Sequence, residues 1–272
     1  MMHAAALVVI AATLVPSSPL GAKDARAADV GRTLRVVEEL RAHAAYEDAV
    51  DEVNGLMKRW YDAGISGPDM VAEADRMRDL LRDLVGLDEA SQAAESNPRA
   101  ARRYLRMLID PAQPTGRSIE QAHALTLLAK HDSRVQELLD NAFPARIVVE
   151  IAGDTPDPAL QSYPFENSIV ELSHDAFPIV HDAGASVLHV RITTEESTAR
   201  NGLIEGTRMK AYAMHMSAEI VGNDGVVVAK VATSLNVLGI DPGNAAHYGM
   251  VRCAQALYQQ LVDEIAKKVA LG

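Results

Sequence analysis

Hydrophobic residues recur every three to four positions from about residue 33 to residue 143, which is the spacing of amphipathic helices. The spacing predicts four such helices, over 34–64, 68–86, 97–111 and 118–143. Asn97 followed by Pro98 is typical of a helix start, and so is Ser118 with Gln121 three residues later. Helices of this length joined by short loops are expected to pack as antiparallel hairpins.

The spacing changes after residue 144. The run 146–153 is continuously apolar and rich in β-branched residues, as in a buried strand. Residues 166–185 return to a helical stripe, although Pro178 must kink or shorten that helix. Residues 185–197 then alternate between apolar and polar side chains, which predicts a strand with one buried face.

The stretch 207–239 has the clearest pattern in the chain. Two long alternating segments flank Asn223, Asp224 and Gly225, and an Asp-Gly pair is typical of a hairpin turn. A last helix follows, with Asp241 as its cap and Pro242 in its first turn. We expect the order β-α-β-β-β-α, with three or four strands and both helices on one face of the sheet.

The two patterns together predict an α+β protein. An all-α domain of helical hairpins over 28–143 would precede a sheet domain over 144–272. The chain has 272 residues, of which 48% are hydrophobic and 23% charged, and these are ordinary values for a globular protein. Such a length is enough for one large domain or two modest ones.

The N-terminus predicts export. The apolar run AAALVVIAATLV, residues 4–15, has the length of the hydrophobic region of a signal peptide, although no Lys or Arg precedes it. Small residues offer cleavage after Ala22 or Ala27, so residues 1–27 are interpreted as a signal peptide, and the alternative is a buried N-terminal helix. No cysteine that could carry a lipid lies just after the apolar run, and no later hydrophobic run is long enough to span a bilayer. We expect a periplasmic or secreted chain without a lipid anchor.

The net charge of −11 argues against a nucleic-acid partner. Acidic residues exceed basic ones by six both in 28–143 and in 144–272, so neither predicted domain is basic. No phosphate-binding loop, nucleophile elbow or HExxH motif occurs. We therefore expect no cofactor and no enzymatic activity.

Two stretches of the helical region resemble tetratricopeptide repeats. They are AAYEDAVDEVNGLM and VAEADRMRDLLRDLVGLDEA…RRYLRMLIDP, and the second has Gly86, Tyr104, Leu108 and Pro111 in the positions of such a repeat. The spacing from Gly86 to Tyr104 is longer than the period of about 34 residues allows, and no clean third copy follows. A plain helical bundle is the alternative.

The sheet region resembles a domain used in bacterial envelope assembly. The resemblance rests on EGTRMKAYAMHMSAEIVGNDGVVVAKVATSLNVLGIDPGNAA, a long hairpin leading into an amphipathic terminal helix. It is similar to the α/β domain of the curli secretion lipoprotein, the middle domain of flagellar assembly protein T and the N-terminal domain of the Tol-Pal translocation protein. The resemblance implies an interaction or scaffold protein that binds an envelope protein partner and performs no chemistry.

Four arginines form the most specific surface feature that the sequence predicts. They follow helical spacing on one face of the third predicted helix: Arg99, Arg102, Arg103 and Arg106. Such a basic stripe on an acidic protein could bind an acidic partner or an anionic envelope polymer. The alternative is a solvated face whose arginines pair with Glu95 and nearby acidic residues.

The polar positions of the predicted strands supply a second group of candidates. His189 and His215 lie at polar positions of two strands that are expected to be neighbours, with Ser234 and Asn236 on the same face. A metal site that serves a hydrolase is one interpretation. A partner-facing surface is the other. A small-molecule carrier is a third function, favoured if an apolar pocket opens between the domains.

The single cysteine is expected to be structural. Cys253 lies six residues after His247 in the last helix, so the two side chains point about 120° apart. Cys253 shares a stripe with Met250, Leu257 and Leu261, the side of the helix that must be buried. We predict that it packs in the core and is not a nucleophile.

Overall fold

The computed structural model describes residues 22–64, 68–110, 112, 116–152, 158–174, 176–196 and 209–272. Most of the predicted signal peptide lies outside the described residues, and Ala22 is the first residue of the first helix. The other cleavage position, after Ala27, lies within that helix. None of the helices in the described part is long and apolar enough to cross a membrane.

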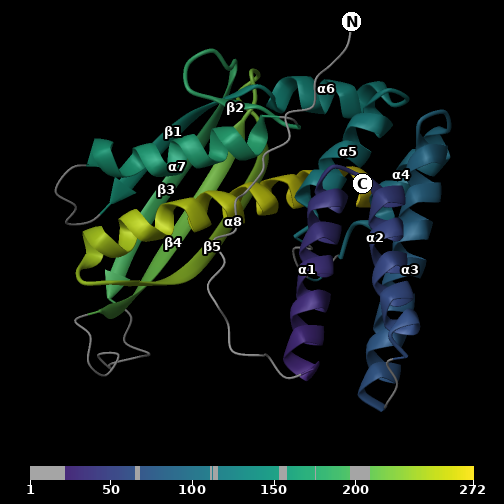
Figure 1. The fold of residues 1–272 in the computed structure, drawn as a ribbon. Coiled ribbons are helices and arrows are strands. Elements are labelled where there is room, and N and C mark those ends of the chain that lie inside the picture. Colours follow the sequence, from purple (N-terminus) through teal and green to yellow (C-terminus); the bar gives the residue numbers. More distant parts are fainter. Residues whose placement is uncertain are drawn as a thin grey trace, which may run out of the picture.

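Six helices occupy the first part of the described chain: α1 (Ala22–Ala42), α2 (Tyr46–Asp62), α3 (Pro68–Ala94), α4 (Pro98–Met107), α5 (Ser118–Ala129) and α6 (Ser133–Ala142). Each packs against its neighbour in the chain, as hairpins require. The helices α1, α2 and α3 extend away from the sheet (Figure 1). Asn97 caps α4 as predicted, accepting hydrogen bonds from the backbone N–H groups of Arg99 and Ala100, with Pro98 at the first helical position.

Two of the four predicted helices are in fact broken in two. Ala44 takes a left-handed conformation with φ 54° and ends α1, where the N–H of Ala45 donates to the carbonyl of Leu40. A second break follows α5, where the side chain of Asp132 caps α6 by accepting from the N–H of Arg134. The predicted cap at Ser118 is also wrong, because Ser118 is the first helical residue and its side chain caps nothing.

The helix α3 continues past Gly86, where the sequence predicts its end. It runs for 27 residues, which is most of a tetratricopeptide repeat of about 34 residues. A Cβ at Gly86 would meet only Met107 Cε, at 3.9 Å, so no close approach requires a glycine there. The tetratricopeptide resemblance stays a prediction, and α3 departs from it in length.

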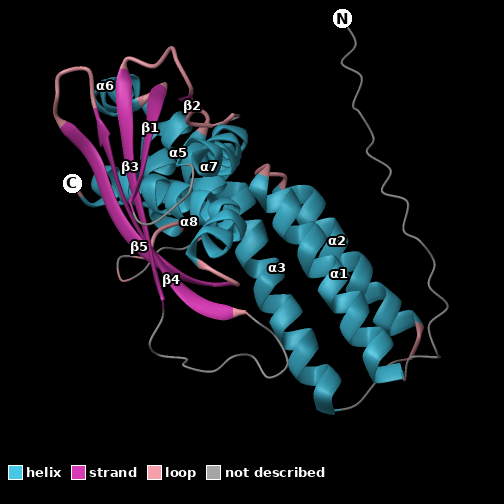
Figure 2. Ribbon diagram, turned by 90° about the vertical axis from the view of Figure 1, so that its left-hand side faces the viewer, coloured by secondary structure: helices cyan, strands magenta, loops and turns pink. Residues whose placement is uncertain are grey.

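The sheet has five strands in the order β2-β1-β3-β4-β5. They are β1 (Ala145–Ala152), β2 (Ile179–Val180), β3 (Ser186–Glu196), β4 (Lys210–Val221) and β5 (Val227–Gly239). The strands β2 and β3 are parallel to β1, whereas β4 and β5 continue the sheet in antiparallel fashion. The helices α7 (Pro158–Ser173) and α8 (Pro242–Leu271) lie on one face of this sheet (Figure 2). The predicted α+β class is confirmed.

The predicted helix over 166–185 is the main error in this region. The helix α7 starts earlier and ends at Ser173, whose Oγ accepts the N–H of Ile179 at 2.9 Å. After Pro178 the chain forms the two-residue strand β2 instead of a further helical turn. The predicted hairpin is confirmed, with Gly225 at φ 77° and the carboxylate of Asp224 accepting the N–H of Val226.

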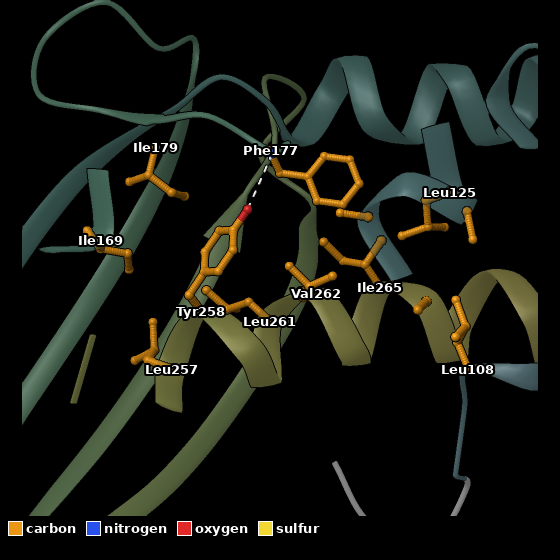
Figure 3. Packing of buried hydrophobic residues seen from close by; sticks show 14 of the residues in the cluster. Leu108, Leu125, Ile169, Phe177, Ile179, Leu257, Tyr258, Leu261, Val262 and Ile265 are labelled. Atoms are coloured by element: carbon orange, nitrogen blue, oxygen red, sulfur yellow. Dashed lines mark hydrogen bonds between the residues drawn. The ribbon is translucent and has the colours of Figure 1, made fainter. Parts of the chain in front are cut away.

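The helix α8 joins the sheet to the helical part. In Figure 3 its residues Leu257, Tyr258 and Leu261 lie toward Ile169 and Ile179, and its next turns lie toward Leu125 and Leu108. Tyr258 accepts the N–H of Phe177 through its hydroxyl at 3.3 Å, drawn as the dashed line. The buried residues form one hydrophobic cluster across both parts. The packing of the core does not divide the chain in two, so the predicted domain boundary between residues 143 and 144 stays a prediction.

Candidate functional site

The face of the sheet opposite α7 and α8 carries polar side chains on all four long strands. Along β3, Leu188, Val190 and Ile192 are buried under the helices, while His189 and Arg191 are exposed on the other side. The strand β4 repeats this alternation and points its polar residues to the same side. We call this surface the open face.

The register fixes which side chains are neighbours on the open face. Three successive rows run from β1 to β5: Val148, His189, Glu219 and Lys230; Glu150, Arg191, Ser217 and Ala232; Ala152, Thr193, His215 and Ser234. Each of the first two rows holds one acidic and one basic residue, and small residues become frequent in the second and third rows. Because small side chains stand between long ones, the face is uneven.

Two hollows result from this unevenness. One of about 380 Å³ lies around His189, Glu219 and Lys230. The other, of about 530 Å³, lies around His215 and Ser234. Arg191 borders both hollows. Volumes of this size are in the range of small ligand sites, but those sites are concave and mostly apolar, whereas these hollows lie along an exposed polar sheet.

The sequence placed four candidate residues on this surface, and all four lie there. His215 is directly opposite Ser234. Asn236 follows two residues along β5, opposite Ala213. His215 lies opposite Thr193 of β3, which is four residues along that strand from His189. The structure therefore brings together His215 and Ser234, but it does not bring together the two histidines.

An ion pair and a histidine–glutamate contact link neighbouring strands on the open face. Lys230 Nζ lies 3.3 Å from Glu219 Oε2, and His215 Nε2 lies 3.8 Å from Glu195 Oε1. Within the described ranges, no three His, Cys, Asp or Glu residues are grouped as a metal site would require. A hydrolase that uses His189 and His215 on a shared metal has no geometric support in this arrangement.

The arginine stripe lies along α4 and lines a hollow of about 350 Å³. Arg102 Nη2 is 2.8 Å from Asp132 Oδ2, at the start of α6. Arg106 Nε donates to the carbonyl of Ala270, near the end of α8. These two arginines hold elements together, and the predicted pairing with Glu95 is replaced by Asp132. Arg99 and Arg103 are exposed and make no ion pair with any described residue.

The cysteine lies in the core as predicted. Cys253 is fully buried, with its Sγ 3.9 Å from Met214 Sδ, and His247 is exposed. Burial raises the pKa of the Cys253 thiol to about 12. A nucleophilic cysteine needs a lowered pKa and access to solvent, so this thiol is structural.

A buried polar cluster in the helical part is absent from the sequence prediction. Arg41 and Glu120 form a bidentate pair at 3.1 and 3.2 Å, and the hydroxyls of Tyr46 and Tyr104 are hydrogen bonded beside it. Burial raises the pKa of Tyr104 to about 12. The cluster ties α1, α2, α4 and α5 together, and its enclosure indicates a structural role.

An apolar groove lies at the far end of the helical part, rather than between the two parts. It has a volume of about 430 Å³ and lies between α1, α2 and α3. Its lining includes Val30, Gly31, Trp60 and Met70, with Arg26 and Arg76 among its charged residues. A Cβ at Gly31 would meet nothing within 4 Å, so a larger side chain there has room to enter the groove.

Comparison with known proteins yields little. No family model matches the chain, and no curated protein matches it. Among solved structures, the chain has a likeness to "a putative lipoprotein from Caulobacter crescentus CB15", with 19% identity, 50% of this chain covered, 89% of that chain covered and a TM-score of 0.23. A superposition this loose assigns neither a fold nor a function to the present chain.

Proposed function

We propose that this chain is an exported, non-enzymatic interaction protein of the bacterial cell envelope. It binds an envelope protein partner through the open face and takes part in the assembly of an envelope complex. Arg99 and Arg103, the two outward-facing residues of the arginine stripe, supply a second contact. Export rests on the apolar run at residues 4–15, followed by the small residues Ala22 and Ala27.

The single observation that carries the proposal is the contrast between the sheet's two faces. One face is covered by α7 and α8, whereas the open face is covered by no described element. Both signs of charge lie on it, with Arg191 and Lys230 beside Glu150 and Glu219. This mixture fits the polar surface of a protein partner better than a polyanion, which favours an excess of positive charge.

The same geometry supports the proposal that the open face has no catalytic activity. Catalytic groups converge on one point where a substrate atom can lie within hydrogen-bond distance of each. The ionisable side chains of the open face are spread over successive rows of a sheet, with His189 and His215 four residues apart along it. Such a distribution suits recognition over an area.

The proposal is tested by reversing one charge on each side of the sheet. Arg191→Glu changes a residue that borders both hollows, and Arg252→Glu makes the same change on an exposed position of α8. The purified variants are cross-linked in an envelope extract, and captured proteins are identified by mass spectrometry. We expect a partner that is captured by the wild type and by Arg252→Glu but lost with Arg191→Glu. Equal capture by both variants would remove the open face from the proposal.

The groove beside Trp60 favours one second candidate, a carrier of a small apolar molecule. Trp60 is the only tryptophan of the chain, so its fluorescence reports on the groove alone. Titration with palmitate would change this fluorescence if the groove binds an acyl chain. Gly31→Leu fills the groove and should abolish the change, whereas Gly55→Ala on α2 should retain it. No response in the wild type would end the carrier interpretation.

A further inference from the structure

The two edges of the sheet are protected to different degrees. At one edge, β2 pairs with only the first two residues of β1, and the rest of β1 carries the charged residue Glu150. At the other edge lies β5, which has 13 residues and pairs with β4 on one side. No described strand pairs with its other side. An exposed edge of this length offers a row of backbone groups to another strand.

Protection on β5 is confined to its first residues. The register shifts opposite Ile220 and Val221, as at a bulge, and Lys268 Nζ donates to the carbonyl of Val228 at 2.5 Å. Lys230 follows. Bulges and lysines are the usual devices against pairing between edges. From Val231 to Gly239 the strand has neither a charged residue nor a proline, so nothing there opposes a second strand.

The residues of β5 are also complementary to themselves in the antiparallel direction. Exposed apolar residues lie at both ends of the strand, Val226 and Val227 at one and Leu238 and Ile240 at the other. A two-fold axis at Thr233 would pair residues 231–235 of the two strands with each other and place Lys230 opposite the uncharged Asn236. No like charges meet in this register, and Leu238 and Ile240 of each strand lie beyond the paired segment, toward Val226 and Val227 of the other.

We propose that β5 pairs antiparallel with β5 of a second copy of this chain, about a two-fold axis at Thr233. Each strand supplies the hydrogen-bonding partner for the other, as in an isologous interface. The two sheets then become one, and the two open faces become a single extended surface. The proposal goes beyond the function given above, because it concerns a contact between copies at the edge and leaves the open face available.

Sedimentation velocity over a range of protein concentrations tests this pairing. The wild type is expected to show a dimer that dissociates on dilution. Ser234→Lys places two lysines next to the axis and should weaken dimerisation at least about 10-fold, since like charges close together across strands are destabilising. Ser217→Lys puts the same charge on β4, within the open face, and should leave dimerisation unchanged. A monomeric wild type, or equal weakening by both variants, would overturn the proposal.

A cross-linking experiment tests the axis itself. In the proposed register Ala232 of one copy lies opposite Ser234 of the other. Chains with Ala232→Cys mixed with chains with Ser234→Cys should therefore join through a short thiol cross-linker. The native Cys253 is buried and does not compete. Mixing Ala232→Cys with Ser217→Cys should give no such product. Equal yields from the two mixtures would contradict pairing about Thr233.

Discussion

The two faces of the sheet are built from the same strands, yet they differ in almost every physical respect. Leu188 is fully buried under the helices, and its neighbour His189 is exposed on the open face. On β4, Met214 packs against Cys253 while the adjacent His215 lies beside Glu195 on the other side. Because side chains alternate along a strand, residues one position apart belong to different environments.

The two faces of the sheet are expected to have different roles, the covered face in folding and the open face in recognition. The covered face supplies apolar burial, at about 25 cal/mol per Å², and the open face supplies exposed groups whose ion pairs contribute little. A residue on the covered face should therefore act mainly on the free energy of unfolding. A residue on the open face should act mainly on partner binding. Substitutions of adjacent residues can test whether this separation holds.

The largest expected effect comes from the covered face of β3. Leu188→Ala removes a fully buried side chain and should lower the free energy of unfolding by about 2–5 kcal/mol. His189→Ala, one residue away, should change it by less than about 0.5 kcal/mol. Urea unfolding followed by circular dichroism measures both. Similar losses for the two variants would show that the open face is buried in solution.

The contact between α8 and the covered face should be the next most sensitive. A Cβ at Gly249 would lie 2.3 Å from Met214 Sδ and 2.9 Å from Val237 Cγ1. Gly249→Ala should therefore destabilise the protein by about 1–3 kcal/mol through overpacking, even though alanine favours a helix. Gly55→Ala on α2 meets only the end of Arg59, at 3.5 Å, and should be neutral or stabilising.

A double variant tests whether the clash with Met214 causes the loss of stability in Gly249→Ala. Combining Gly249→Ala with Met214→Ala removes the closer of the two atoms that would clash, so the double variant should lose less stability than the two single losses added together. Simple additivity in thermal unfolding would mean that α8 shifts to avoid the contact.

The sequence predicts those parts of the fold that depend on local spacing, and it fails where two local signals compete. The apolar stripe over 34–64 continues across Ala44, so it does not reveal the turn that separates α1 from α2. Gly86 suggests a helix end, but a helical glycine costs only about 1 kcal/mol. The fully buried Leu84 and Leu87 beside it outweigh that cost.

The candidate surface is predictable only in part for a related reason. Alternation places His189 and His215 on the polar side of their strands, but the spacing between them depends on the register of β3 against β4, which no local pattern reveals. The Arg41–Glu120 pair joins residues 79 positions apart. One local signal existed, because Glu120 stands in a helix whose other residues are mainly apolar and small.

The pH dependence of stability should reflect buried acidic groups, two of which lie on α8. Burial raises the pKa of Cys253 to about 12 from 9.0 and that of Tyr258 to about 12 from 10.0. Both groups are neutral in the folded state and ionise more readily once unfolded. Their contribution is complete below about pH 9 and is lost as the pH rises toward 12. Unfolding in urea between pH 8 and 11 should show this decline, and Cys253→Ala should reduce it.

Reactivity of the thiol gives a second readout of the same burial. Native protein should react slowly with a thiol reagent at pH 8, whereas Ser234→Cys on the exposed strand should add one fast-reacting group. Fast reaction of the native Cys253 would mean that α8 separates readily from β4.

The smallest effect is expected from the ion pair on the open face. Lys230 Nζ lies 3.3 Å from Glu219 Oε2, and the Lys230 side chain is 71% exposed. Lys230→Ala should therefore change the free energy of unfolding by less than about 0.5 kcal/mol, and added salt should reduce even that change. The same substitution removes the only lysine of β5, so sedimentation should show dimerisation as strong as in the wild type or stronger. A loss of stability comparable with that of Leu188→Ala would contradict the division of roles between the two faces.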